Sequence, residues 1–577
     1  MKKEEKISKI RHSIAHMLAI EILKFDPKAK LAIGPVIDNG FYYDVEFSKD
    51  KNPTDKELKN FQTGIKKQTN KKTLFEFEEI TENRARELFI NNPYKLELID
   101  ELIEKNEKIR IYKTGDFIDL CKGPHIKDTS EIDPSAFAIT HLAGAYWRGN
   151  EKNKMLTRIY GVAFESKEKL TEYQKMIEEA KNRDHRKIGK EMDLFTFSPL
   201  VGSGLPLYTP KGTALIDTLQ KHIEKVCKKY GFEKVKTPHI AKVDLFQISG
   251  HATKYAKELF SVSSQAGHEF ILKPVQCPHQ TQIYASRIRS YKELPIRYME
   301  SDRQYRAEKT GEIGGLNRVY AITVEDGHVF CTVEQIKEEV KNIINIIIDF
   351  YTDLGLWNKH WVSLSLRDPK HPENYIGDDS DWQTSEKILE EISNEMGLNA
   401  TKCEGEAALY GPKLDFMFKD AMGKEIQIPT VQLDFATPKR FNLTYIDNKG
   451  KKVTPVMIHR AILGSYERLL VLLIEHFAGN FPYWLAPVQV TVLPINEVHD
   501  KKAKEIYNVL RDQDIRVELN DSDEAFGKKV RKTKVERVPY FIIIGDKEVK
   551  TGKLTLESRD NGKVGNFKIK KLIDKLK

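Results

Sequence analysis

The stretch SDRQYRAEKTGEIGGLNRVYAITVEDGHVF, residues 301–330, places two strand-like runs around a glycine-rich loop. Arg306 and Glu308 are two residues apart, so they would share one face of a strand, and Arg318 opens the second run. Arginine on a rigid strand matches the geometry of a phosphate. The pattern fits either a nucleotide held on a sheet surface or an ordinary hairpin with surface charges, and this stretch alone favours the hairpin.

Runs of the same kind occur on both sides of this stretch. Residues 294–306, 318–330, 413–418 and 428–436 alternate apolar and polar side chains, which predicts half-buried antiparallel strands. The run HRAILGSYERLLVLLIEHF, residues 459–477, predicts a helix that is almost wholly apolar except for Arg468 and a few others. Burying an unpaired arginine is costly, so Arg468 either pairs internally or meets an anionic ligand.

Length and composition limit the alternatives. A chain of 577 residues is too long for one core, since domains usually run to ~100–200 residues. A net charge of +9 permits nucleic-acid binding without proving it. Five dispersed cysteines argue against a disulfide framework and favour a reducing cytoplasm. We expect no membrane span, because no apolar run reaches ~18 residues, and no signal peptide, because the N-terminal MKKEEKISKI has no apolar core.

Composition and periodicity divide the chain into four parts. Residues 1–165 mix strand-like and helical runs, and 166–190 read as a solvated linker helix. Residues 191–485 hold the predicted antiparallel strands. From 486 to 577 strands alternate with helices, which predicts a small α/β domain with a partly parallel sheet and a basic second helix, KKVRKTKVER.

Two short motifs near the N-terminus suggest a metal. RHSIAHMLA places His12 and His16 at i and i+4 on one helix face, and DLCKGPHI places Cys121 and His125 four residues apart. Three histidines and a cysteine are a plausible zinc set. The residues alone leave a zinc centre and a metal-free pocket equally open.

Several motifs together resemble a known family. YRAE, the arginine after the loop and GSYER are similar to motifs 2 and 3 of the class II aminoacyl-tRNA synthetases. FILKPVQCPH, EDGHVFCT, ALYGPKLDF, TVQLDF, PVMIHRAILGSYER and FPYWLAPVQV narrow the resemblance to the threonyl-tRNA synthetase family, and DNGFYYDVEF and DLCKGPHI resemble its editing domain. The similarity runs from about residue 7 to 570. It implies a multidomain α+β fold: an N-terminal α+β editing domain, an antiparallel class II core and a C-terminal α/β anticodon-binding domain.

The resemblance implies ATP-dependent ligation of L-threonine to tRNA(Thr) through a threonyl-adenylate. Cys277, His328 and His459 match the family's zinc ligands, one zinc per subunit with an open coordination position. Threonine can offer the ion an amino group and a hydroxyl, whereas valine lacks the hydroxyl. An apolar pocket alone separates such isosteres by only a factor on the order of 10².

The remaining catalytic-domain residues follow from the same resemblance. Arg306 and Arg468 are expected to hold the α- and γ-phosphates and to be catalytic, with Mg²⁺ entering on ATP. The expected ATP contacts are Arg306, Glu308, Arg318, Gln427 and Arg468. The expected threonine contacts are Asp326, Tyr410, Gln432 and Ser465.

Serine also has an amino group and a hydroxyl, and its missing methyl is worth only ~1–3 kcal/mol, so a second sieve is required. The resemblance implies an editing pocket that hydrolyses seryl-tRNA(Thr) without a metal and excludes the threonine methyl. Its expected residues are His12, His16, Lys95, Asp119, Cys121 and His125. Glu548 matches an anticodon-contacting position, and the segment ending at Pro238 matches the family's dimer interface, so a homodimer is expected.

The chain also departs from the family pattern. Its similarity to the family starts at the editing domain, so we expect it to lack the usual small ubiquitin-like domain. His279 and Gln280 replace Gly-His after the zinc cysteine, and Ile322 and Val324 replace an adenine-stacking phenylalanine and a glutamine. In the anticodon domain the substituted positions are Asp523 and Glu557.

Three alternatives follow from these departures and from the N-terminal motifs RHSIAHMLA and DLCKGPHI. One is an adenylate-forming paralogue that no longer charges tRNA(Thr). Another is a zinc hydrolase built on the four N-terminal ligands. The last is a non-enzymatic RNA-binding regulator, which the retention of both motif arginines and of all three zinc ligands argues against.

Overall fold

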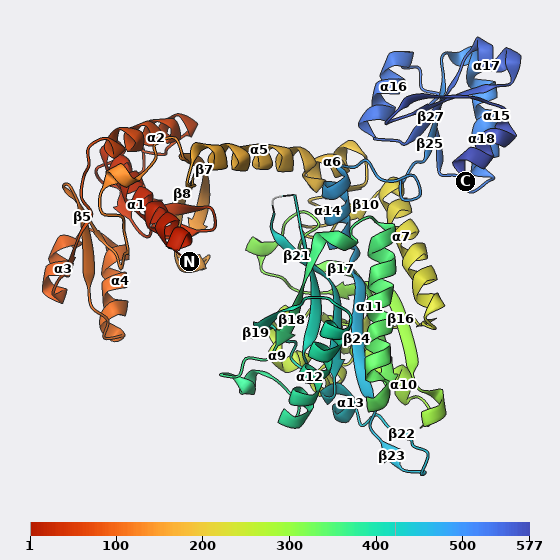
Figure 1. The fold of residues 1–577 in the computed structure, drawn as a ribbon, viewed down its shortest axis with the longest axis horizontal. Coiled ribbons are helices and arrows are strands. Elements are labelled where there is room, and N and C mark those ends of the chain that lie inside the picture. The colour runs from red at the N-terminus through yellow and green to blue at the C-terminus, as the bar shows by residue number, and fades with distance from the viewer. Residues whose placement is uncertain (1, 422) are drawn as a thin grey trace. The chain divides into compact units, whose positions relative to one another are not determined.

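The computed structural model describes residues 2–421 and 423–577, and the chain forms two compact units, Met1–Glu178 and Glu179–Lys577 (Figure 1). The units adjoin inside α5 (Lys167–Arg183), which is followed by α6 (His185–Glu191). α5 and all but the last residue of α6 fall in the segment 166–190 that was predicted as a linker. Among the described residues, none of the helices combines the length and the apolar character needed to cross a bilayer.

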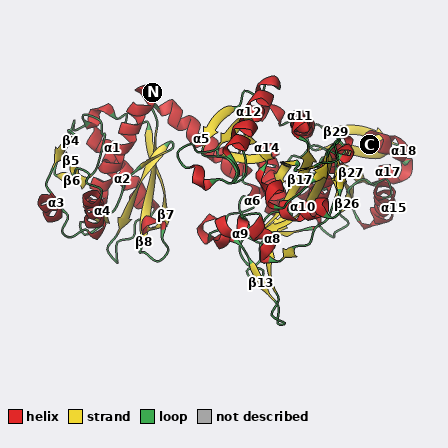
Figure 2. Ribbon diagram, turned by 90° about the horizontal axis from the view of Figure 1, so that it is seen from below, coloured by secondary structure: helices red, strands yellow, loops and turns green. Residues whose placement is uncertain are grey.

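The first unit centres on an antiparallel sheet in the order β1-β3-β8-β7, with β2 paired to β3. Helices α1 and α2 contact each other and pack on this sheet, and a second group of β4, β5, β6, α3 and α4 forms a separate lobe (Figure 2). The elements are α1 (Lys2–Phe25), β1 (Lys30–Leu31), β2 (Val36–Ile37), β3 (Gly40–Glu46), α2 (Asp55–Thr69), β4 (Glu76–Glu79), α3 (Glu82–Leu88), α4 (Pro93–Glu104), β5 (Arg110–Thr114), β6 (Phe117–Leu120), β7 (Phe137–Tyr146) and β8 (Met155–Ala163).

The second unit is built on an eight-stranded sheet in the order β11-β16-β17-β24-β21-β20-β18-β19. Neighbours from β16 to β18 are antiparallel, as the alternating sequence runs predict, and only β11 and β19 at the two ends pair in parallel. The strands are β11 (Glu233–Lys234), β16 (Ile296–Tyr305), β17 (Ala321–Cys331), β18 (His360–Leu366), β19 (Thr401–Glu404), β20 (Lys413–Lys419), β21 (Glu425–Asp434) and β24 (Val456–Ser465).

One face of this sheet carries the largest core of the molecule. Val329 of β17 and Ile458 of β24 pair across the strands and pack with α7, α11 and α14. The neighbouring cross-strand pair, His328 and His459, therefore lies on the opposite face, since successive side chains alternate. The helices of this unit are α7 (Pro210–Lys229), α8 (Val243–Ile248), α9 (His251–Lys254), α10 (Cys277–Ala285), α11 (Ile336–Asp353), α12 (Asp379–Glu395), α13 (Ala436–Arg440) and α14 (Tyr466–Phe477).

The boundary between β24 and α14 corrects one prediction. The sequence predicts a helix over 459–477, but residues 456–465 are strand and the helix begins at Tyr466. β24 is buried on both faces, so it lacks the alternation that distinguishes a strand from a helix. The change of structure falls at Gly464, whose φ of +61° favours glycine and whose added Cβ would lie 2.7 Å from Ile428 O.

Three further residues differ from the sequence expectation. Arg306 and Glu308 were expected on a strand, but β16 ends at Tyr305 and both residues lie in the irregular segment that follows. Arg318 precedes β17 and forms an isolated bridge with Gly314. The strands stop where the chain must turn into the glycine-rich loop, so these side chains are presented from loop backbone rather than from strand backbone.

The C-terminal part of the second unit forms its own sheet in the order β26-β25-β27-β28-β29. β25 pairs in parallel with β26 and β27, while β28 and β29 are antiparallel, which confirms the predicted partly parallel α/β sheet. The elements are β25 (Val490–Pro494), α15 (Asp500–Arg511), β26 (Val517–Leu519), α16 (Phe526–Val535), β27 (Tyr540–Ile544), α17 (Asp546–Thr551), β28 (Leu554–Ser558), β29 (Gly562–Phe567) and α18 (Ile569–Leu576).

Candidate functional site

A cavity of about 330 Å³ opens on the polar face of the eight-stranded sheet. It gathers almost every site residue expected of the catalytic domain, although these residues are spread over nearly two hundred positions of sequence. The expected residues that line it are Cys277, Arg306, Glu308, Arg318, Asp326, Tyr410, Gln427, Gln432, His459, Ser465 and Arg468. The substituted positions Ile322 and Val324 also line it, as do Gln304, Asn317 and Thr430, which the sequence did not single out.

Three buried side chains at one side of this cavity form a potential metal centre. The ligand atoms of Cys277, His328 and His459 all lie within 4.8 Å of one another. Cys277 begins α10, whereas the two histidines face each other across β17 and β24, with His328 Nε2 3.1 Å from His459 Nδ1. One thiolate and two imidazoles that leave a coordination position open toward a cavity are a known zinc set.

Electrostatics and hydrogen bonding also fit a cation at this place. Burial raises the pKa of the Cys277 thiol and lowers that of His328, so both groups are neutral in a metal-free protein because nearby charge does not offset their burial. Asp434 Oδ2 lies 2.8 Å from His459 Nε2 and accepts a hydrogen bond from its N–H, which leaves Nδ1 free as a ligand atom. The donor set therefore fits zinc by ligand type, spacing and outer hydrogen bonds.

The amino-acid side of the cavity adjoins this cluster. The Tyr410 ring stacks on the His459 ring at a centroid distance of 4.5 Å, and its hydroxyl donates to Gln432 Oε1 at 2.8 Å. Burial raises the pKa of Asp326 to about 6, and one of its oxygens lies 3.9 Å from His328 Nε2. A carboxylate and two polar groups thus surround the space next to the potential metal, where an amino group could be received.

Three arginines converge at the other side of the cavity. Arg468 projects from the first turn of α14, and its pKa is lowered by burial and then by the nearby charges of Arg306 and Arg318. Arg306 Nε donates to Pro274 O at 3.3 Å, and Arg468 Nε donates to Asn317 O at 3.2 Å. These two guanidinium groups are held by backbone carbonyls rather than by carboxylates, which leaves positive charge to bind phosphates.

Ser465 and Gln427 have structural partners that the sequence did not indicate. Ser465 Oγ accepts the Arg468 N–H at 3.2 Å and so caps the N-terminus of α14, which fixes the start of the helix that carries the arginine. Gln427 Nε2 donates to Asp415 Oδ1 at 2.6 Å and to Thr430 Oγ1 at 3.0 Å. Both residues line the cavity, but part of their polar capacity is already used.

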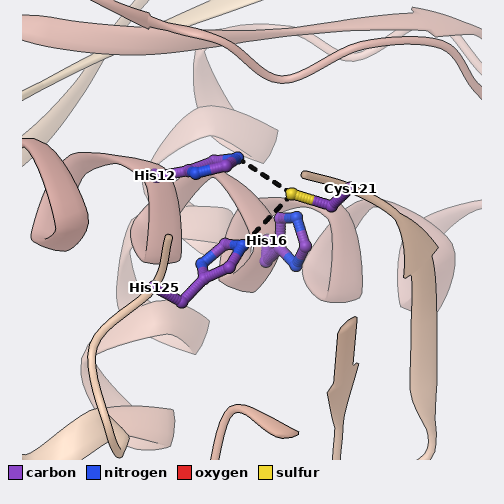
Figure 3. A group of neighbouring side chains, drawn as sticks. All are labelled: His12, His16, Cys121 and His125. Atoms are coloured by element: carbon purple, nitrogen blue, oxygen red, sulfur yellow. Dashed lines mark hydrogen bonds between the residues drawn. The ribbon is translucent and has the colours of Figure 1, made fainter. Parts of the chain in front are cut away.

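The four N-terminal ligands of the first unit also come together (Figure 3). Cys121 Sγ lies 3.2 Å from His12 Nε2 and 3.3 Å from His125 Nε2, and the ligand atoms of these residues and His16 are within 4.8 Å of one another. Burial raises the pKa of Cys121 to about 12 and lowers the pKa values of all three histidines. At neutral pH the pocket therefore holds a thiol and neutral imidazoles, which can hydrogen-bond to water or to a substrate.

A buried ion pair supports this pocket. Lys95 Nζ lies 2.5 Å from Asp119 Oδ1, and Asp119 also accepts the Tyr43 hydroxyl and approaches His16 Nε2 at 3.8 Å. Lys95 and Asp119 are both buried. All six residues expected for editing therefore lie in one connected cluster, with His16 Nδ1 lacking a hydrogen-bond partner in the described part of the chain.

Glu548 is less available than expected. It is buried at the start of α17, where its carboxylate accepts the Gly545 N–H at 3.1 Å and the Thr555 hydroxyl at 2.6 Å. Asp523 is exposed before α16, and Glu557 lies half-buried on β28. A base contact by Glu548 would therefore need the carboxylate to share or exchange these partners.

Three parts of the chain match known family models. Residues 260–477 match the tRNA synthetase class II core domain (G, H, P, S and T), and residues 489–577 match the anticodon binding domain. Residues 109–160 match the threonyl and alanyl tRNA synthetase second additional domain. The catalytic unit is therefore that of a class II aminoacyl-tRNA synthetase.

Individual relatives narrow this class. The chain is 44% identical over 565 residues to a threonine--tRNA ligase of Gloeobacter violaceus, covering 97% of this chain and 90% of that protein. It is 42% identical to that of Staphylococcus aureus, covering 96% and 85%. The chain belongs to the threonine--tRNA ligase family.

Solved structures point the same way. The RNA-binding domain of threonyl-tRNA synthetase from Cryptosporidium parvum superposes with a TM-score of 0.64 at 34% identity, covering 68% of this chain and 97% of that chain. A putative threonyl-tRNA synthetase from Aeropyrum pernix gives a TM-score of 0.59 at 27% identity, covering 68% and 95%.

Proposed function

We propose that this enzyme activates L-threonine as a threonyl-adenylate and transfers it to tRNA(Thr), with one zinc ion per subunit reading the substrate hydroxyl. The observation that carries this proposal is the buried Cys277, His328 and His459 cluster opening into the same cavity as three converging arginines. When bound, the zinc would act as a Lewis acid that coordinates the amino and hydroxyl groups of threonine. Valine offers no hydroxyl and would be rejected.

The chain's own residues then orient the reaction. Asp326 would accept a hydrogen bond from the substrate amino group, and Arg306 and Arg468 would hold the α- and γ-phosphates of ATP, which enters with Mg²⁺. The threonine carboxylate attacks the α-phosphorus, a P–O bond forms, and pyrophosphate leaves with the electron pair of the broken P–O bond. The negative charge that grows on the α-phosphate oxygens lies against Arg306. No general base is needed, because the carboxylate is already ionised.

Two buried cysteines of the same unit allow a matched test. Cys277→Ala removes a proposed ligand, whereas Cys331→Ala removes a buried thiol from β17 that lies outside the cluster. We expect the first variant to lose its zinc and its threonine-dependent aminoacylation of tRNA(Thr), and the second to keep both. A Cys277→Ala protein that keeps one zinc and full activity would sink the proposal.

We further propose that the first unit hydrolyses seryl-tRNA(Thr) without a metal. The imidazoles of His12, His16 and His125 could hydrogen-bond to an attacking water and position it, and the Lys95–Asp119 pair could hold the serine and the tRNA end. Preformed seryl-tRNA(Thr) should be deacylated by the enzyme much faster than threonyl-tRNA(Thr). The tight spacing of the four ligands favours a metallohydrolase as the second candidate, and two zincs per chain, one of them lost in Cys121→Ala, would establish it instead.

We propose that the enzyme works as a homodimer, with the segment ending at Pro238 at the interface. Its support is the sequence resemblance to the class II interface motif. Sedimentation of the full chain at several concentrations would test it, and a monomer at enzyme-assay concentrations would count against it. The substitutions at Ile322 and Val324, which line the cavity, favour the paralogue alternative only if threonine fails to support ATP–pyrophosphate exchange.

A further inference from the structure

Gln280 is a fully buried amide that faces one of the proposed zinc ligands. It lies one helical turn after Cys277 on α10, so the helix that supplies the thiolate also presents Gln280 to the same region. Gln280 Oε1 lies 2.7 Å from His328 Nδ1. Nothing in the substrate cavity explains this contact, because Gln280 does not line it.

Glu300 determines which way this amide points. Its carboxylate accepts the Thr237 N–H at 2.6 Å, the Thr237 hydroxyl at 3.0 Å and the Gln280 Nε2–H at 3.4 Å. An ionised carboxylate has no hydrogen to donate, so the amide nitrogen of Gln280 must face Glu300. The amide oxygen is then the atom that faces His328, and it can only accept.

This orientation fixes the tautomer of His328. Since Gln280 Oε1 accepts, the ring proton must be on Nδ1, which leaves a lone pair on Nε2. Asp434 fixes His459 in the complementary way, with its proton on Nε2 and a lone pair on Nδ1. The two lone-pair nitrogens, His328 Nε2 and His459 Nδ1, face each other at 3.1 Å, and such a pair is resolved only by a cation or a proton between them.

We propose that Gln280, oriented by Glu300, is a positioning residue that holds His328 in its metal-binding tautomer and ring orientation. The inference rests on the proposed zinc centre and extends it to a chain of contacts from Thr237 through Glu300 and Gln280 to His328. Outer partners of metal-bound histidines typically contribute a factor of about 10 to 100 in metal affinity. Gln276, which directly precedes α10, donates instead to Asp302 O, so it takes no part in this chain.

The test measures zinc affinity of the full-length enzyme by competition with a chromophoric chelator. Gln280→Met keeps the length of the side chain but cannot accept the His328 proton, and we expect it to weaken zinc binding about 10- to 100-fold. Glu300→Gln should weaken it less, because the Gln280 amide can then turn over. Gln489→Met is the matched control. Gln489 is a buried amide that accepts from Arg516 N and donates to Tyr483 O. It directly precedes β25 of the C-terminal sheet and is distant in sequence from the proposed ligands.

A double variant separates positioning from simple core packing. Gln280→Glu with Glu300→Gln keeps the net charge and again gives His328 an acceptor, now the new carboxylate, while the new amide donates to it. We expect the double variant to recover most of the zinc affinity, and the cobalt-substituted protein to regain the visible absorption of the wild type. Packing alone would leave the double variant as impaired as Gln280→Met.

The outcomes distinguish this inference from the proposal beneath it. A wild-type enzyme without zinc overturns the zinc centre itself. A wild-type enzyme with one zinc, together with unchanged affinity in Gln280→Met, overturns only the positioning role. If Gln280→Met fails to fold, the Glu300→Gln variant and the double variant still decide, since an unchanged affinity in Glu300→Gln and an unrecovered affinity in the double variant both contradict the role.

Discussion

Replacing Asp434 by asparagine should selectively weaken zinc binding. Asp434 is completely buried, with Oδ2 accepting His459 Nε2–H at 2.8 Å and Oδ1 accepting the N–H groups of Ala436 and Thr437, both at 2.8 Å. An asparagine keeps this shape and can still accept from the two backbone groups. Its NH₂ then faces His459 Nε2, which forces the ring proton onto Nδ1, the ligand atom.

The alternative amide orientation turns the NH₂ against two backbone donors, so neither orientation preserves the site. The change loses a hydrogen bond to a charged group, worth about 1.5–3 kcal/mol, which corresponds to about 10- to 150-fold in zinc affinity. Zinc affinity by chelator competition measures the effect. Asp415→Asn is the control, because Asp415 is a buried carboxylate of the same sheet that contacts neither histidine. Equal zinc affinity in Asp434→Asn and Asp415→Asn would refute the reasoning.

Three further perturbations test other parts of the molecule. Lys95→Met leaves the Asp119 carboxylate buried without its ion-pair partner, so it should lower the stability of the first unit by about 3–5 kcal/mol in urea unfolding. It should also abolish seryl-tRNA hydrolysis. Adding Asp119→Asn to this variant should restore stability but not hydrolysis. Burial raises the pKa of Glu467 to about 7, above its ordinary value of 4.5, so the folded protein holds a proton that the unfolded chain releases and stability falls as pH rises between those values. Glu467→Gln cannot ionise and so does not lose stability in this way. Calorimetry should show the difference in unfolding free energy between this variant and the wild type shifting in favour of the variant by up to about 3 kcal/mol from pH 5 to pH 8. A constant difference would contradict the burial effect. Arg468→Ala should lower kcat/KM for ATP by about 10²–10³-fold, while Arg440→Ala, outside the cavity, should leave it unchanged.

Much of the fold follows from the alternation of the sequence. The strands at 294–306 and 413–418 were predictable because one face of each is polar, and the C-terminal α/β pattern because its strands and helices alternate cleanly. The strand at 456–465 was not, because burial on both faces removes the alternation and because the helix that follows is equally apolar.

The candidate site shows a similar limit. Cys277, His328 and His459 are too far apart in sequence for spacing to join them, so only the family resemblance brought them together before the strand register did. Asp434 and Gln280 contact the proposed ligand histidines and do not line the cavity. Gln280 stood out in sequence only as a departure, and its contact with His328 depends on how α10 packs against β17, which no local pattern encodes.

The most direct test of the zinc-based selection of threonine is amino-acid-dependent ATP–pyrophosphate exchange with threonine, serine and valine, made on protein whose zinc content is counted. A pocket that reads the hydroxyl through zinc predicts exchange with threonine, weaker exchange with serine, none with valine, and one zinc per chain. Valine exchange comparable to that of serine on zinc-loaded protein would contradict this reading. Folded, zinc-loaded protein that gives no exchange with threonine would contradict it equally and would direct attention to Ile322 and Val324 in the cavity wall.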